Sequence, residues 1–124
     1  MSLKHSLVSV IDDDESVRES LPDLLRAFGH SVETFASAEQ YLASKSIDTS
    51  DCLILDIGMP GMSGPELQRE LRHRGKRTPI VFITALKDDA VRLQLIAQGA
   101  IDCLFKPFSA VALQQALDIA LSTP

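Results

Sequence analysis

One apolar stretch, residues 52–55, limits the possible folds more than any other part of the sequence. It runs into a single carboxylate, Asp56, and a loop rich in Gly, Met and Pro follows as far as Gly64. A short, continuous apolar run bounded by Gly and Pro is typical of a strand buried on both faces, as in a parallel sheet. We therefore predict a central strand that carries Asp56 to the edge where open α/β sheets have their functional sites.

Four more apolar runs of similar length alternate with stretches of helical periodicity. The predicted strands are residues 7–11, 31–35, 52–56, 79–83 and 103–105, and the predicted helices are residues 16–28, 38–44, 64–74, 87–98 and 110–121. Residues 46–51 are predicted to be a polar connector, and residues 122–124 a linker or the end of the domain. Five strand–helix repeats without a break in composition predict one α/β domain over residues 1–124, with a parallel sheet and right-handed crossovers.

Polar residues mark the predicted helix starts. Ser37 with Gln40, and Ser63 with Glu66, each have the form of a capping box. The first helix follows an acidic run, and Asp14 or the acid after it is predicted to cap that helix rather than to take part in chemistry.

Composition excludes two classes of partner. The chain has 12 Lys and Arg against 17 Asp and Glu, a net charge of -5, and no basic stripe, so we expect no direct contact with nucleic acid. If the protein controls transcription, another segment or partner contacts the DNA. No apolar run approaches the ~20 residues of a membrane span, and residues 1–5 lack the apolar core of a signal peptide. We expect a cytoplasmic protein without membrane contact.

Four of the five predicted strands end in a charged or polar residue. Asp12 and Asp13 follow the first strand, Asp56 closes the third, Thr84 the fourth and Lys106 the fifth. Because parallel strands point their carboxyl ends the same way, these side chains are predicted to converge at one edge of the sheet. The predicted site thus contains three carboxylates, one hydroxyl and one ammonium group.

Three carboxylates in one pocket need cations. A pair of like charges at about 4 Å costs about 4 kcal/mol at an effective dielectric constant near 20. Lys106 offsets part of this repulsion, and an all-oxygen site without His or Cys favours Mg²⁺ or a similar hard cation for the rest. A metal that bridges carboxylate and phosphoryl oxygens lets Asp56 act as a nucleophile and form an acyl phosphate, with Lys106 and Thr84 contacting its oxygens.

With these residues, the sequence resembles the receiver domain of bacterial two-component response regulators and is most similar to the FixJ-like subgroup. The motifs that carry the resemblance, in the family's order and spacing, are Ile11-Asp12-Asp13, Leu55-Asp56 followed by Met59-Pro60 and Gly64, Thr84-Ala85, and Lys106-Pro107-Phe108. Each motif is weak alone, whereas the set is highly specific and covers nearly the whole chain. The resemblance implies a flavodoxin-like (βα)5 fold with strand order 2-1-3-4-5 and helices on both faces.

The resemblance also implies the role of each acid. Asp56 would accept a phosphoryl group from a sensor histidine kinase. Asp13, Asp56 and the backbone carbonyl of Gly58 would hold Mg²⁺, and Asp12 would act mainly through a metal-bound water.

The same resemblance implies how phosphorylation is sensed. Thr84 would move towards the phosphoryl group, and Lys106 would pair with it. The bond before Pro107 would be cis, a form found in only about 5–6% of X-Pro bonds in folded proteins. A partner, or a second copy in a homodimer, would contact the helix over 87–98 and the strand and helix that follow it. The protein would be a switch rather than a metabolic enzyme, whose only chemistry is its own phosphorylation and dephosphorylation.

One position departs from the family's pattern, and a second bears on the lifetime of the phosphate. The family usually has Tyr, Phe or His three residues before the lysine, where this chain has Cys103, and Phe105 adjoins Lys106 too closely to be a clear substitute. Gly58 has no side chain to shield a phosphoryl group from water, so we predict that the lifetime of the phosphate is not specially prolonged.

The two cysteines, Cys52 and Cys103, are predicted to be buried and reduced. They show no metal-binding spacing, and both lie in apolar runs. With one strand between theirs, their Cα atoms would be about 10 Å apart, beyond the ~7 Å limit for a disulfide.

Two other functions fit part of the sequence. A phosphatase of the haloacid dehalogenase type uses an aspartyl phosphate, but it needs a second Asp where this chain has Gly58. A receiver-like interaction domain that works without phosphate is the other alternative, and the complete set of pocket residues argues against it.

The basic residues between 72 and 77 are predicted to be a solvated helix end.

Overall fold

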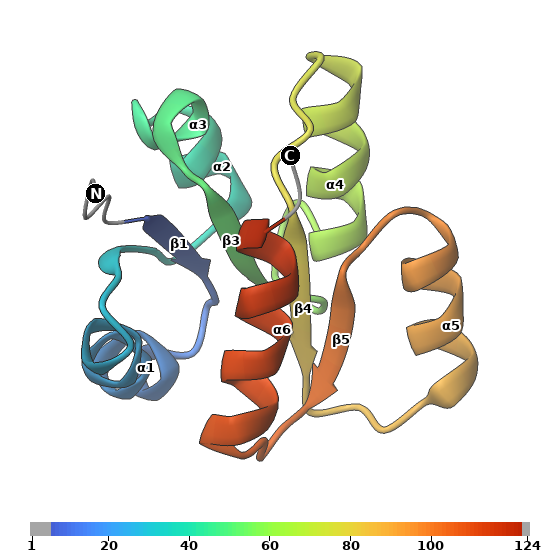
Figure 1. Cartoon of the computed structure of the whole chain (residues 1–124). Helices are drawn as coiled ribbons and strands as arrows, with labels where there is room; N and C mark the ends of the chain where they lie inside the picture. The colour runs from blue at the N-terminus through green and yellow to red at the C-terminus, as the bar shows by residue number, and fades with distance from the viewer. Residues whose placement is uncertain (1–5, 123–124) are drawn as a thin grey trace.

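A computed structural model of the protein describes residues 6–122, and in that range the chain forms five strands and six helices (Figure 1). The elements are β1 (Leu7–Ile11), α1 (Glu15–Ala27), β2 (Ser31–Phe35), α2 (Ala38–Leu42), α3 (Ser46–Thr49), β3 (Cys52–Asp56), α4 (Gly64–His73), β4 (Ile80–Thr84), α5 (Asp89–Ala97), β5 (Asp102–Phe105) and α6 (Ala110–Ser122). The predictions made for residues 1–5 and 123–124 lie outside the described residues.

All five strands form one parallel sheet in the order β2-β1-β3-β4-β5, which confirms the expected flavodoxin-like topology. β3 lies at the centre, and each of its five residues is buried, as the continuous apolar run predicts. In the register of the sheet, Asp56 is opposite Ile83 and Thr84 is opposite Phe105. The carboxyl ends of these strands are therefore close to level at one edge.

Alternate residues of the strands feed two separate cores. Val8, Val10 and Ile54 pack with α1 and α6 on one face, whereas Leu53 and Leu55 pack with α2, α4 and α5 on the other. Figure 1 shows α1 and α6 together in front of the sheet. This alternation follows from the two-residue period of a strand, and covering both faces is what a parallel sheet requires.

The helix starts agree with the predicted pattern at one site and differ at another. Ser63 and Glu66 form a complete capping box, with backbone-to-side-chain hydrogen bonds of 3.2 and 2.9 Å. Ser37 does accept the Gln40 N–H at 3.1 Å, but the Gln40 side chain accepts from Ala36 N–H at 3.0 Å. The box at Ser37 is therefore wrong in its second half, because the side chain reaches one residue past the cap.

The predicted connector over residues 46–51 is wrong, because Ser46–Thr49 forms the short helix α3. The helix depends on tertiary contacts, as expected for a segment too short to be stable alone. The buried Tyr41 donates its hydroxyl to the Ser46 carbonyl at 3.3 Å and to Ser50 Oγ at 3.1 Å. Ser50 N–H in turn donates to the Ser46 carbonyl at 2.8 Å.

Two boundaries near the C-terminus also differ. β5 begins at Asp102, where Asp102 Oδ1 accepts the Cys103 N–H at 2.7 Å and an Arg92 N–H at 2.8 Å. Ser122, predicted as part of a linker, is the last residue of α6.

Both cysteines are free and buried, as predicted. Cys52 belongs to the core under α1 and α6, and Cys103 to the core under α2, α4 and α5, so their side chains lie on opposite faces of the sheet. Within residues 6–122, no helix combines the length and apolar character that crossing a membrane would require.

Candidate phosphoacceptor site

An acidic pocket lies at the carboxyl edge of the sheet. Its volume is about 310 Å³, and it is lined by Asp12, Asp13, Asp14, Asp56, Gly58, Thr84, Ala85, Leu86 and Lys106. Every residue that the sequence placed in the site is in this set. The convergence predicted from parallel topology is thus observed: four strands each deliver a polar group at their ends.

Asp12 is the most completely fixed residue of the pocket. Its side chain is fully buried; Oδ2 accepts from Lys106 Nζ at 2.9 Å and Oδ1 accepts from Asp14 N–H at 2.9 Å. Its backbone carbonyl accepts from Arg18 Nη1 at 2.9 Å, and its N–H donates to the Phe35 carbonyl at 3.1 Å. A buried carboxylate is tolerated when it is paired and hydrogen-bonded in this way.

Asp56, the last residue of β3, is 7% exposed and faces the same ammonium group. Its Oδ1 is 3.8 Å from Lys106 Nζ. Burial and the nearby charge of Asp12 raise the pKa of Asp56 to about 7, although Lys106 acts in the opposite direction. One lysine is therefore too little to neutralise the carboxylates of the pocket.

Lys106 responds to the same charges. Burial alone would lower the pKa of Lys106, but the hydrogen bond to Asp12 and the charge of Asp56 outweigh burial, so the pKa is raised. The ammonium group is thus held in its charged form between two carboxylates.

The pocket fits a hard divalent cation. Carboxylate oxygens of Asp12, Asp13 and Asp56 lie within 4.8 Å of one another, and Asp13 is exposed at the mouth of the pocket. A cluster of carboxylate oxygen donors without His or Cys matches the preference of Mg²⁺. Gly58 also lines the pocket and is exposed.

Thr84 closes β4 and connects the pocket to the segment before α5. Its side chain is 6% exposed, and Oγ1 accepts the Leu86 N–H at 3.0 Å. That hydrogen bond leaves the hydroxyl proton free for an acceptor in the pocket. Thr84 is thus connected by one hydrogen bond to the backbone that leads into α5.

Asp14 has a structural role, as predicted. It caps α1 by accepting the Ser16 N–H at 2.9 Å and the Ser16 hydroxyl at 2.8 Å, and these hydrogen bonds lower the pKa of Asp14. Cys103, which occupies the family's aromatic position, is buried in the core among neighbours that include Leu95 and Phe82 and does not line the pocket. Lys106-Pro107 is cis, as expected from the resemblance.

Sequence reasoning missed how closely α4 approaches Asp56. Gly64 N–H donates to the Ile57 carbonyl at 2.9 Å, which folds the loop back onto the end of β3. A Cβ at Gly64 would lie 3.1 Å from the carbonyl carbon of Asp56 and closer still to its oxygen. The Ser63 capping box marks the start of α4 in the sequence, but no local signal shows that the backbone of Asp56 packs against Gly64.

Comparison with known proteins agrees with this site and topology. The family model described as the response regulator receiver domain matches residues 8–118, and the chain belongs to this family. Receiver domains bind Mg²⁺ through an acidic pocket and interact with histidine kinases, so the cluster of acids has the expected form.

Similar proteins include several response regulators. The chain is 40% identical over 121 residues to response regulator protein TodT of Pseudomonas putida, covering 98% of this chain and 53% of TodT. It is 38% identical over 114 residues to transcriptional regulatory protein FixJ of Azorhizobium caulinodans, covering 92% of this chain and 54% of FixJ. The chain thus spans about half the length of these relatives.

Solved structures give the same result. A structure of response regulator StyR has a TM-score of 0.86 at 45% identity, covering 95% of this chain and 60% of that one. A crystal structure of FixJ-N has a TM-score of 0.86 at 33% identity, covering 98% of this chain and 97% of that one.

Proposed function

We propose that Asp56 accepts a phosphoryl group from a sensor histidine kinase in a Mg²⁺-dependent reaction, which makes this chain a cytoplasmic signalling switch. One observation carries the proposal: Asp56 is a nearly buried carboxylate at the end of the central strand, with a paired lysine and two further carboxylates around it. A structural carboxylate has no need of such a setting, whereas a phosphoacceptor does.

The transfer has a simple balance. An Asp56 oxygen attacks the phosphorus in line, the P–O bond forms as the P–N bond to the kinase imidazole breaks, and the imidazole keeps the electron pair. Lys106, already 3.8 Å from Asp56, neutralises a phosphoryl oxygen, and the Thr84 hydroxyl donates to another. The product is an acyl phosphate on Asp56.

The acids of the pocket would also hold the Mg²⁺ ion. Asp13, Asp56 and the Gly58 carbonyl are the proposed Mg²⁺ ligands, with Asp12 acting mainly through a bound water. When bound, Mg²⁺ neutralises charge between the carboxylates and the phosphoryl oxygens. Asp12 also fixes Lys106 by the 2.9 Å hydrogen bond, so it positions the lysine whether or not the metal is present.

Phosphorylation would act on the surface formed by α5, β5 and α6. It adds up to about two negative charges beside Thr84, and the Thr84–Leu86 hydrogen bond passes that pull to the start of α5. Leu86, Leu93 and Val111 expose 65%, 62% and 64% of their surface there. Exposed apolar side chains in and beside these elements are available to a partner or to a second copy in a homodimer. Control of transcription would then belong to another segment or protein.

The direct test is intact mass after incubation with acetyl phosphate. With Mg²⁺, the wild type should gain the mass of one phosphoryl group, and Asp56→Asn should gain none. Omitting Mg²⁺ should abolish the gain. No gain in the wild type would favour an interaction domain independent of phosphate, and steady turnover of phosphomonoesters would favour a phosphatase.

A further inference from the structure

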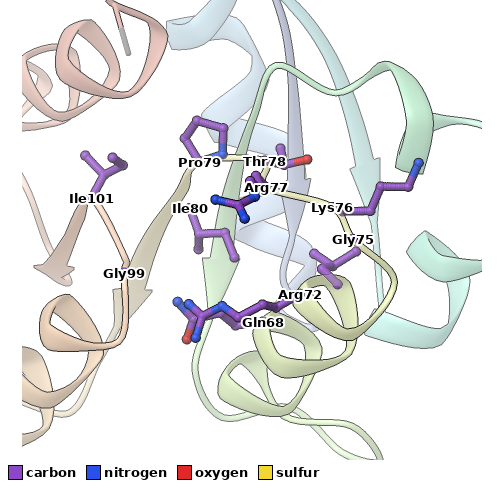
Figure 2. Close-up of a pocket in the computed structure, with 11 residues that line it drawn as sticks. Gln68, Arg72, Gly75, Lys76, Arg77, Thr78, Pro79, Ile80, Gly99 and Ile101 are labelled. Carbon is purple, nitrogen blue, oxygen red and sulfur yellow. The ribbon is translucent and has the colours of Figure 1, made fainter. Parts of the chain in front are cut away.

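A second pocket lies at the other edge of the sheet, among the amino ends of β4 and β5 (Figure 2). It is bounded by α4, by residues 75–79 leading into β4, and by Gly99 and Ile101 ahead of β5. Its volume of about 380 Å³ falls in the range of about 300–1,000 Å³ that is usual for small-molecule sites. The proposed phosphoacceptor site lies at the carboxyl edge, so the two pockets are separate.

The pocket combines apolar walls with one buried amide. Leu71 and Ile80 are buried, and Pro79 and Ile101 are half-buried. Gln68 is only 5% exposed, and within residues 6–122 its side-chain amide has no hydrogen-bond partner, although neither amide atom is fully shut off from solvent. The donors and the acceptor of this amide are therefore available to a polar group in the pocket.

Cations surround the pocket. Lys76 is paired with Asp48, and Arg72 donates to the Gln98 carbonyl. Neither Arg72 nor Arg77 has a salt bridge in the part of the chain that the structure describes. The residues predicted to be a solvated helix end thus place uncompensated positive charge at a cavity, in a chain whose net charge is -5.

The position of the Arg72 guanidinium depends on a glycine. Gly99 has φ +107, and a Cβ there would lie 2.9 Å from Arg72 Nη2. In Figure 2, the side chains of Gln68 and Arg72 both extend from α4 towards the segment that carries Gly99. The glycine therefore permits both the turn and the approach of the guanidinium group.

We propose that this pocket binds a small organic anion, with an apolar body and a carboxylate or phosphate head group. The body would pack on Leu71 and Ile80. The guanidinium groups of Arg72 and Arg77 would pair with the anionic oxygens, and the amide of Gln68 would donate to one of them. The site is independent of phosphorylation at Asp56, so either can fail without the other.

The test compares three probes of similar size: benzoate, phenyl phosphate and neutral benzyl alcohol. Each is titrated into ¹⁵N-labelled protein with EDTA, so that no metal supports binding in the acidic pocket. The two anions should give saturable amide shifts centred on Gln68, Lys76 and Gly99. Arg77→Gln should weaken anion binding about tenfold, which is about 1.4 kcal/mol. Arg69→Gln removes the same charge from an exposed position of α4 outside the pocket and should change affinity less than about twofold.

The outcomes separate cleanly. Saturable binding of either anion, weakened about tenfold in Arg77→Gln and nearly unchanged in Arg69→Gln, supports the proposal, and the tighter anion identifies the head group. Benzyl alcohol binding as tightly as the anions would overturn it, as would equal effects of the two substitutions. The absence of saturable shifts for both anions up to about 20 mM would also overturn it.

Discussion

Replacing the proposed acceptor should stabilise the metal-free domain. Burial and the charge of Asp12 raise the pKa of Asp56 from its ordinary value of 3.8 to about 7, so the folded state resists ionisation of this carboxyl. A rise of about three pH units at about 1.4 kcal/mol each sets an upper limit near 4 kcal/mol. Allowing for solvent and salt at the pocket mouth, we expect Asp56→Asn to raise the free energy of unfolding by about 1–3 kcal/mol at pH 8.

The stabilisation by Asp56→Asn should depend on pH, because the pKa of Asp56 is higher in the folded state than in the unfolded state. Below pH 3.8 the carboxyl is protonated in both the folded and unfolded states, so it costs the fold nothing. Between pH 3.8 and about 7 only the unfolded state ionises freely, and stability is lost as the pH rises through this window. The advantage of Asp56→Asn should therefore be largest above pH 7 and less than half as large at pH 5.

Urea denaturation with EDTA at pH 5 and pH 8 measures this difference. Asp118→Asn, an exposed acid on α6, is the matched control and should change little at either pH. Mg²⁺ should then stabilise the wild type more than Asp56→Asn, because the variant lacks one proposed ligand. A variant no more stable than the wild type at pH 8, or an advantage that does not grow with pH, would refute the electrostatic reasoning.

Three further predictions concern neighbouring residues. Gly64→Ala should lower the free energy of unfolding by more than about 2 kcal/mol in urea titrations, because its Cβ would meet the backbone of Asp56. Gly58→Ala has open space around it and should cost under about 1 kcal/mol. Similar costs for the two variants would contradict this packing. Lys106→Gln leaves the buried Asp12 without its cation, so it should destabilise the metal-free domain by about 2–4 kcal/mol. Mg²⁺ should restore part of that loss. No change in stability in the same titration would be inconsistent with the pairing. Gly58→Leu should shield the acyl phosphate from water and slow its hydrolysis a few-fold, measured as decay of the phosphorylated mass, and an unchanged rate would count against an open site.

The sequence was sufficient for the strands and for the convergence of their ends. The run into Asp56 and the polar ends at Thr84 and Lys106 are local signals, and parallel topology alone turns them into one pocket. The short helix α3 was missed because its hydrogen bonds with Tyr41 and Glu33 join different elements, which a local pattern does not reveal. Gly64 was recognised as part of a motif. A glycine is needed there because the backbone at position 64 packs against the backbone of Asp56, and no sequence pattern shows this contact.

Both pockets also contain contacts that the sequence does not reveal. Arg18 fixes the backbone of Asp12 from one turn into α1, and the sequence offers no signal for that contact. The basic residues before β4 have the composition of a solvated helix end, and only the fold places Arg72 and Arg77 around the buried Gln68. Side-chain contacts made in the folded chain, rather than local propensity, decide both cases.

The central claim concerns which atom carries the phosphoryl group, and reduction of the phosphorylated chain with borohydride tests it most directly. Borohydride converts an aspartyl phosphate to homoserine, and peptide mass mapping locates the changed residue. We expect one homoserine, at position 56, only in samples treated with both acetyl phosphate and Mg²⁺. Homoserine at position 12 or 13, or in none of the three acids of a chain that has gained the phosphoryl mass, would contradict the account.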